Sequence, residues 1–333
     1  MTAKRCAMYY ESYRKKPKRR RQRRSFGEWL LQSLLKLIAL ILIVAILCAA
    51  VMYALPPMFF AVEPEGKDLS LTDGLPGSCV NVLLLGTDVL SKNSQRSDAM
   101  IIASVGYGRL KLTSVLRDTY VEIPGHGMGK LNAAFAYGGA DLAMKTLNQN
   151  FGLNIMHYAQ VDFVALVKVV DAIGGVEINL TDAEVERLNS TILDARRVFK
   201  PLGYVATPVT QSGENIHVDG LQALAYARIR KIDSDFVRAS RQRILLNAML
   251  KKLRDNLWNP VMLTRLIRTI LESVNTNMSP AQMLSLGEKA LLAGTSEQMR
   301  LPVDGTYEDD GSKLTVTNRT ANRDAFIRFV YGS

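Results

Sequence analysis

The chain has 333 residues and a formal net charge of +11, with 42 basic and 31 acidic side chains. The excess charge lies at the amino terminus: residues 1–28 hold eleven Lys and Arg against two Glu, whereas residues 56–333 are close to neutral. A short basic tail without hydrophobic periodicity cannot form a DNA-binding domain, and the near-neutral remainder is not a polyanion-binding surface, so the composition argues against a nucleic-acid-binding protein.

A stretch of 19 uncharged residues, Leu37 to Leu55, predicts a membrane-spanning helix that begins with the lead-in Trp29 to Lys36. Such a helix is about 28 Å long at ~1.5 Å per residue, close to the thickness of a bilayer core. The basic tail predicts a cytoplasmic amino terminus by the positive-inside rule. A cleaved signal peptide is the alternative, but its apolar stretch is usually shorter. We therefore expect a single-pass cell-membrane protein with a basic cytoplasmic tail (1–28), a transmembrane helix (29–55), a linker (56–78) and an extracytoplasmic domain (79–333).

The domain begins with three apolar segments that predict strands. Val80–Leu85 is continuously apolar and ends at Gly86, which is typical of a strand buried on both faces. Met100–Val105 and Leu110–Leu116 predict two further strands, and Gly106-Tyr107-Gly108 between them predicts a hairpin turn.

The rest of the chain alternates between helical and strand patterns, which predicts an α/β fold with a mixed central β-sheet sandwiched by helices. Asn189–Thr210 shows no clear period and is expected to be a mobile excursion. Helices are expected over Leu131–Tyr137, Leu142–Phe151, Phe163–Ile173, Asp219–Ala227, Phe236–Leu253, Pro260–Val274, Pro280–Leu292 and Asn322–Val330, and strands over Ile155–Val161, Val176–Leu180, Met299–Val303 and Leu314–Thr317.

Two carboxylates flank the first strand connection. Asp88 lies two residues beyond the end of the buried strand, where open α/β sheets usually place their ligands, and Asp98 lies at the entrance to the next strand. Two such carboxylates can share a Mg²⁺ ion, which accepts one or two protein carboxylates together with water and phosphate oxygens. The alternative is that each Asp only hydrogen-bonds its own turn.

Several arginines follow in positions that suit a phosphate or pyrophosphate group. Arg228 and Arg230 are two apart and point the same way if that segment is extended, and Arg238 and Arg241 share one face of the next helix near its amino terminus. The alternative is a solvated basic face that pairs with the nearby Asp233 and Asp235.

Arg117 follows the third predicted strand and is the remaining candidate. It could equally be solvated at the strand end and neutralised by its neighbour Asp118.

Seven segments occur in an order that resembles the LytR-CpsA-Psr family of bacterial cell-wall glycopolymer transferases. No single segment is specific, but their succession is. They are NVLLLGTD, RSDAMIIASV, LTSVLRDTYVEIPG, KLNAAFAYGG, VDFVALVKVVDAIGGVEINL, DGLQALAYARIR and DSDFVRASRQ, and the match runs from about Val80 to Leu250.

The resemblance implies a Mg²⁺-dependent phosphotransferase that moves a teichoic acid, capsular or similar polymer from an undecaprenyl pyrophosphate carrier to peptidoglycan, with pyrophosphatase as a side activity. It implies that Asp88 and Asp98 hold the metal and that Arg117 completes the catalytic set. Asp88 or Asp98 is a candidate to take the proton of the attacking hydroxyl, and the sequence does not decide which. The segment after Arg230 departs from the family pattern. The pyrophosphate-binding positions implied are Arg96, Arg117, Arg228, Arg230, Arg238, Arg241 and Gln242.

Two other functions remain open from the sequence. The arginines would serve a non-catalytic polyprenyl-phosphate or glycan binding protein equally well. A membrane-tethered transcriptional attenuator is the other alternative, although the basic tail is already explained by topology and by attraction to anionic lipids.

Overall fold

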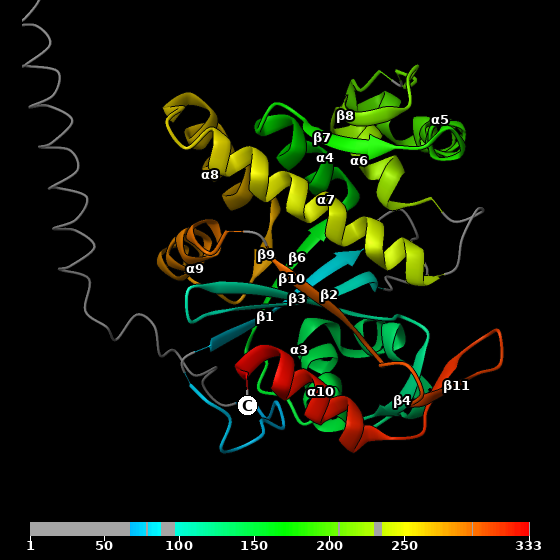
Figure 1. Cartoon of the computed structure of the whole chain (residues 1–333), viewed down its shortest axis with the longest axis vertical. Helices are drawn as coiled ribbons and strands as arrows, with labels where there is room; N and C mark the ends of the chain where they lie inside the picture. The colour runs from blue at the N-terminus through cyan, green and yellow to red at the C-terminus, as the bar shows by residue number, and fades with distance from the viewer. Residues whose placement is uncertain are drawn as a thin grey trace, which may run out of the picture. The chain divides into compact units, whose positions relative to one another are not determined.

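The computed structural model describes residues 67–77, 79–87, 97–205, 207–229, 235–294 and 296–332, without the side chain of Arg197 (Figure 1). The predicted tail and transmembrane helix lie outside these residues, as do the predicted site residues Asp88, Arg96 and Arg230. Among the helices that are described, none is long and apolar enough to cross a bilayer.

A six-stranded mixed sheet forms the centre of the domain, as the sequence predicted. Its central strand β1 pairs antiparallel with β2 and parallel with β6, and β3 pairs parallel with β10. Val82, Leu83 and Leu85 of β1 are buried, in agreement with the prediction of a strand covered on both faces. The strand order is β10 (Glu297–Leu301), β3 (Arg109–Val115), β2 (Ser97–Gly106), β1 (Cys79–Thr87), β6 (His157–Asp162) and β9 (Asn275–Thr276).

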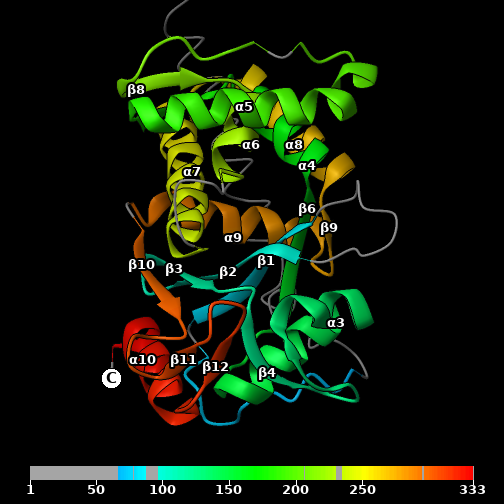
Figure 2. The same cartoon turned by 90° about the vertical axis from the view of Figure 1, so that its right-hand side faces the viewer.

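Helices cover both faces of this sheet. Alternate residues of β2 point to opposite faces, so this one strand contacts the helices on both sides. Met100 and Ile102 face a core that includes α3 (Leu131–Phe151) and α10 (Arg319–Tyr331). Ile101, Ala103 and Val105 face α7 (Asp235–Asp255) and α9 (Pro280–Leu292). Figure 2 shows these helices on either side of the strands.

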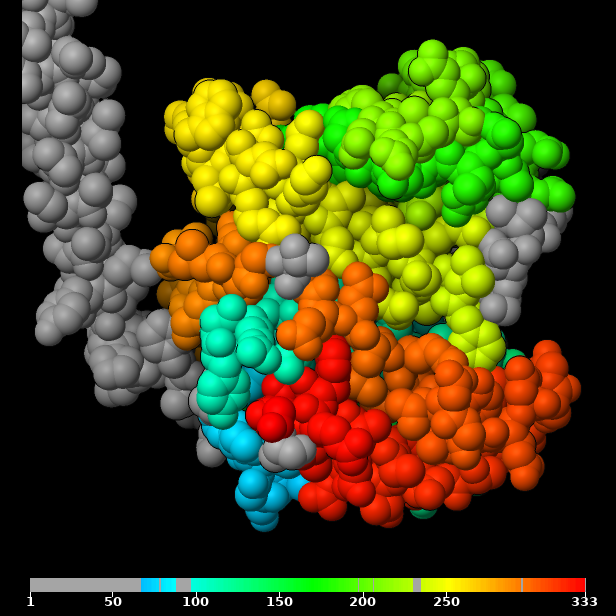
Figure 3. Space-filling view, in the orientation of Figure 1, coloured from blue at the N-terminus to red at the C-terminus, as the bar shows by residue number. Residues whose placement is uncertain are grey.

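A second core lies among helices beyond one side of the sheet. The buried α6 packs against α4 and α5, and α8 packs against α4. In Figure 3 α7 lies across the boundary between this helical part and the sheet on the face in view. The elements around this core are α4 (Phe163–Ala172), α5 (Asp182–Phe199), α6 (Gly220–Ala227), α8 (Pro260–Ser273) and the antiparallel pair β7 (Val176–Leu180) and β8 (Gly213–Val218).

The prediction of an irregular excursion over Asn189–Thr210 was wrong in its first half, because α5 continues to Phe199. A capping box between Thr181 and Glu184 starts this helix, and buried Leu188 and Ile192 lie on one face of it. Both signals are visible in the sequence. A short 3₁₀ helix, η3 (Lys200–Leu202), follows.

A small sheet at the edge of the domain was also missed, because its strands are short. It contains β11 (Tyr307–Asp309), β12 (Leu314–Val316), β4 (Thr119–Ile123) and β5 (Gly127–Lys130). Only the strand near Leu314 was predicted.

Packed structure begins inside the range 56–78 that the sequence suggested as a linker. Leu69 is buried in the core beside α3, its carbonyl accepts a hydrogen bond from Asn148 Nδ2 at 2.9 Å, and the Thr72 amide donates to the Leu153 carbonyl at 3.0 Å. Residues 67–72 are therefore held on the domain by buried contacts.

Candidate active site

Arg117 occupies a tight connection between β3 and β4. Leu116 before it is buried, and its amide donates to the Leu301 carbonyl of the neighbouring strand at 3.0 Å. The Leu116 carbonyl accepts from both the amide and the hydroxyl of Thr119, at 3.1 and 2.6 Å. These bonds hold the backbone of Arg117 at the rim of the sheet.

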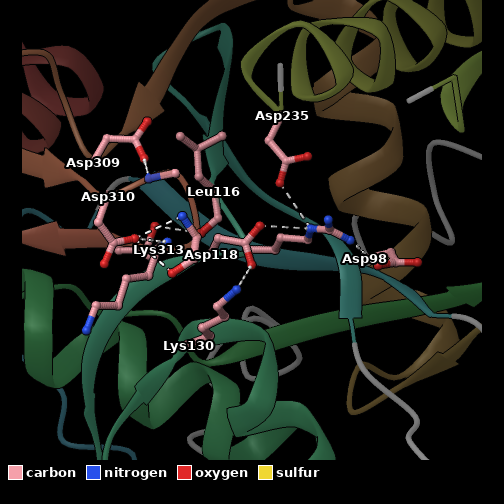
Figure 4. A network of polar contacts seen from close by, with 12 residues as sticks. Asp98, Leu116, Asp118, Lys130, Asp235, Asp309, Asp310 and Lys313 are labelled. Atoms are coloured by element: carbon pink, nitrogen blue, oxygen red, sulfur yellow. Dashed lines mark hydrogen bonds and ion pairs between the residues drawn. The ribbon is translucent and has the colours of Figure 1, made fainter. Parts of the chain in front are cut away.

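The guanidinium of Arg117 binds three carboxylates that come from separate parts of the chain (Figure 4). One terminal nitrogen lies 3.0 Å from Asp98 Oδ1, at the start of β2. Nε lies 3.1 Å from Asp235 Oδ2, at the start of α7, and 3.3 Å from Asp118 Oδ2. Lys130 Nζ adds a second cation 2.9 Å from Asp118 Oδ1. The side chains of this group are only 21–38% exposed.

The charges in this group reinforce one another. Burial alone would lower the pKa of Arg117, but Asp235, Asp118 and Asp98 together raise it above its ordinary value. Burial opposes ionisation of Asp118, yet its contacts with Asp235, Lys130 and Arg117 hold its pKa below the ordinary value. Arg117 and Asp118 are therefore both charged at neutral pH.

Asp235 links this group to the arginines of α7. Its Oδ1 lies 3.2 Å from a terminal nitrogen of Arg238, one helical turn further on. Arg238 and Arg241 have only 6% and 3% of their surface exposed and share one face of the helix. Arg241 Nε donates to Glu184 Oε1 at 2.9 Å, so a carboxylate of α5 neutralises it.

Arg228 lies near the other end of this region. It caps α6, and its guanidinium carbon is 4.4 Å from the centre of the Phe163 ring, a cation–π contact. Asp162 precedes Phe163, caps α4 by accepting from the Ala165 amide at 2.7 Å, and is the register partner of Thr87. Arg228 therefore stacks against the helix start that directly follows the carboxyl end of β6.

The structure thus joins some of the predicted site residues directly. Asp98 binds Arg117, and Arg117 reaches Arg238 through Asp235. Gln242 is half-buried on α7. Asp235 does pair with arginines, as the alternative interpretation expected, but Arg238 and Arg241 are buried and do not form a solvated face. Asp88, Arg96 and Arg230 lie outside the described residues.

The sequence interpretation missed the roles of Lys130 and Glu184. Nothing local identifies Glu184 as a partner of Arg241, since the two are 57 residues apart. Lys130 is brought to Asp118 because the β4–β5 pairing places it opposite Tyr120, two residues beyond Asp118. Both contacts depend on tertiary structure.

The described residues contain no group of three or more His, Cys, Asp or Glu side chains that could hold a metal ion. Magnesium does not require such a group, because one or two carboxylates suffice when water and phosphate oxygens complete the shell. Asp98 is a hard oxygen donor whose side chain is 23% exposed at the rim of the sheet, so its chemistry suits Mg²⁺.

Comparison with known proteins identifies the family of this chain. The model of the LytR_cpsA_psr family matches residues 64–325. The chain is 30% identical over 263 residues to "Regulatory protein MsrR" of Staphylococcus aureus strain COL, covering 75% of this chain and 74% of the relative. It is 30% identical over 256 residues to "Polyisoprenyl-teichoic acid--peptidoglycan teichoic acid transferase TagU" of Bacillus mycoides, covering 72% of this chain and 77% of the relative.

The fold is also similar to solved structures. The structure of "TagT bound to LI-WTA" superposes with a TM-score of 0.60 at 26% identity, covering 77% of this chain and 90% of the other. The crystal structure of Bacillus subtilis TagT superposes with a TM-score of 0.58 at 26% identity, covering 77% of this chain and 92% of the other.

Proposed function

Because the chain belongs to the LytR-CpsA-Psr family, we propose that it is a phosphotransferase that attaches a glycopolymer from an undecaprenyl pyrophosphate carrier to peptidoglycan. The name of the TagU relative, a polyisoprenyl-teichoic acid–peptidoglycan transferase, supports the reaction class. LI-WTA, the ligand bound to TagT in the similar structure, supports a lipid-linked polymer as the donor.

The observation that carries the proposal is the network around Arg117. Its guanidinium is fixed at the rim of the sheet by three carboxylates, and the buried Arg238 is attached to the same Asp235. A planar guanidinium held in one orientation can present two parallel N–H donors to phosphate oxygens. Fixed donors of this kind stabilise charge that develops during phosphoryl transfer without having to reorganise.

In the proposed reaction a sugar hydroxyl of the acceptor attacks the phosphorus atom that carries the glycan. The bond from that phosphorus to the bridging oxygen breaks, and undecaprenyl phosphate leaves with the electron pair. Arg117 and Arg238 stabilise the charge on the departing phosphate, and Asp88 or Asp98 accepts the proton of the hydroxyl. Mg²⁺, when bound by Asp88 and Asp98, would neutralise the diphosphate.

The proposal includes the expected topology. The uncharged stretch Leu37–Leu55 anchors the chain in the cell membrane, the basic tail remains in the cytoplasm, and the domain works outside it. This places the domain beside a carrier whose long isoprenoid chain stays in the bilayer.

The test is a turnover assay with the purified full-length chain in detergent. The donor is an undecaprenyl pyrophosphate-linked glycan, the acceptor is nascent peptidoglycan, and the readouts are released undecaprenyl phosphate and glycan bound to the acceptor. We expect equal amounts of both products and loss of both after chelation of Mg²⁺. Binding of the donor without any release would refute the proposal and favour a non-catalytic binding protein.

The name of the MsrR relative favours a second candidate, a regulatory role. Deletion of residues 1–24 distinguishes the two, because a regulator that acts through the basic tail would lose its effect on transcription. We expect polymer attachment to continue, provided that the shortened chain still inserts.

A further inference from the structure

A shallow pocket of about 420 Å³ lies beside α3, and none of its lining residues belongs to the network around Arg117. Three segments line it: residues 67–69, the β4–β5 turn and the middle of α3. Two of its residues, His126 of the turn and Tyr137 of α3, form a stacked pair with ring centres 4.5 Å apart and planes inclined by 16°. Tyr137 is 56% exposed, so much of this aromatic surface is open to solvent.

The backbone after Tyr137 leaves the helical conformation and so shapes the pocket. Gly138 has φ −147° and ψ 25°, and Gly139 has φ 63° and ψ −155°, so α3 is broken at this point. A Cβ on Gly138 would lie 2.7 Å from Leu142 Cβ, and the positive φ of Gly139 would strain any other residue. Two adjacent glycines are therefore needed for this arrangement of Tyr137 beside the turn.

Charged groups surround the aromatic pair and cancel one another. Lys67 Nζ lies 2.6 Å from Asp141 Oδ2, and Lys145 Nζ lies 2.6 Å from Asp68 Oδ2. Three of these four side chains are more than 40% exposed, so their remaining donors and acceptors can reach a ligand. Two cations and two carboxylates give no net attraction for a polyanion, and they disfavour an apolar tail.

From these observations we propose that the Tyr137–His126 pocket is a binding subsite for an uncharged sugar ring of a glycan. A pyranose has an apolar face of C–H groups that packs against an aromatic ring, and its hydroxyls hydrogen-bond to carboxylates and ammonium groups around the edge. An exposed aromatic stack inside a rim of paired charges meets both requirements. An aromatic ring also supplies contact area at small entropic cost.

The same helix connects the pocket to the network around Arg117. Lys130, which binds Asp118, immediately precedes α3, and Tyr137 follows seven residues later. At ~1.5 Å per residue the two are about 10 Å apart along the axis. A bound glycan could therefore extend from the pocket toward Arg117. We assign this glycan to the peptidoglycan acceptor; that assignment rests on the proposed function, whereas the sugar subsite itself does not.

The test measures binding of N-acetylchitotetraose, a neutral β-1,4-linked amino-sugar oligomer, to the full-length chain in nanodiscs by saturation-transfer NMR. We expect Tyr137→Ala and His126→Ala each to weaken binding about tenfold. Tyr137→Phe should bind within about twofold of the wild type, since it keeps the ring. Tyr107→Ala is the matched control, because Tyr107 is 60% exposed on a different hairpin, and it should bind as the wild type does.

Absence of oligomer binding by the wild type would overturn the inference, as would equal binding by Tyr137→Ala. Preference for poly(glycerol phosphate) over the neutral oligomer would also overturn it. Thermal unfolding of each variant shows whether it is still folded. His126→Ala tests the same pocket through a second residue. The assay contains neither the pyrophosphate carrier nor Mg²⁺, so its outcome is independent of whether the chain proves to be a transferase.

Discussion

Replacement of Arg117 by Ala or Lys should separate its structural from its chemical contribution. Arg117→Ala leaves Asp98, Asp118 and Asp235 close together without their shared counter-ion. Arg117→Lys keeps a positive charge but loses the planar fork that binds several oxygens at once. We therefore expect the Ala variant to lose stability and activity, and the Lys variant mainly activity.

The size of the stability loss follows from the exposure of the group. Breaking a fully buried ion pair costs about 3–5 kcal/mol, whereas an exposed pair contributes less than about 1 kcal/mol. The side chains of Arg117 and its three partners are 21–35% exposed, so solvent screens them in part. We expect Arg117→Ala to lower the free energy of unfolding by about 2 kcal/mol at pH 7, and the melting temperature by roughly 5 °C.

The pH dependence provides an internal check. Because the folded-state pKa of Asp118 is lowered, its contribution to stability is present above the unfolded-state pKa and is lost as the pH falls through the folded-state value. Without Arg117 this contribution is smaller. The difference in stability between wild type and Arg117→Ala should therefore shrink as the pH falls below about 4, where carboxylates become protonated.

The assays are denaturant unfolding of the full-length chain in detergent at pH 7 and at pH 3.5, and release of undecaprenyl phosphate at pH 7. Loss of one fixed donor to a developing oxyanion typically lowers the rate by about 10²–10³-fold, and we expect both variants to fall in that range. A Lys variant with wild-type turnover would refute the role of the fork. An Ala variant of unchanged stability at pH 7 would refute the ion network.

Three further changes test other parts of the structure. Glu184→Gln weakens the buried pair with Arg241 and should lower the free energy of unfolding by about 2–4 kcal/mol; an unchanged denaturation midpoint would contradict this. Gly220→Ala places a Cβ against a backbone carbonyl of α4 and should lower the free energy of unfolding by about 1–3 kcal/mol. In α9, a Cβ at Gly287 meets no atom within 4 Å, so Gly287→Ala should raise the free energy of unfolding by about 0.5–1 kcal/mol. Thermal unfolding that ranks the two variants the other way would contradict this packing. Burial lowers the pKa of His157 despite its contact with a neighbouring amide, so the unfolded chain binds an extra proton as the pH falls below about 6.5. Stability is therefore lost between pH 7 and 5, and His157→Phe should reduce that loss. An unaltered slope of stability against pH would argue that His157 titrates normally.

Local patterns in the sequence determined most of the framework of this domain. The apolar run at Val80–Leu85 predicted β1, and Gly106-Tyr107-Gly108 predicted the β2–β3 hairpin. Both predictions were confirmed. A strand that is buried on both faces and a tight turn each produce a sequence pattern within a few consecutive residues. The prediction of an irregular segment from Asn189 was wrong for the second half of α5, although a capping box and periodic apolar residues mark this helix in the sequence.

Tertiary structure alone decided which charged side chains meet. The sequence could place Arg117 at a strand end, but Asp235 reaches it from 118 positions away, and Glu184 reaches Arg241 across 57. Likewise, the Gly138-Gly139 pair is visible in the chain, but the stacking of Tyr137 on His126 is not. Secondary structure follows from residues a few positions apart, so a local pattern predicts it. A site forms when segments far apart in the sequence pack together, and no local pattern shows which segments will meet.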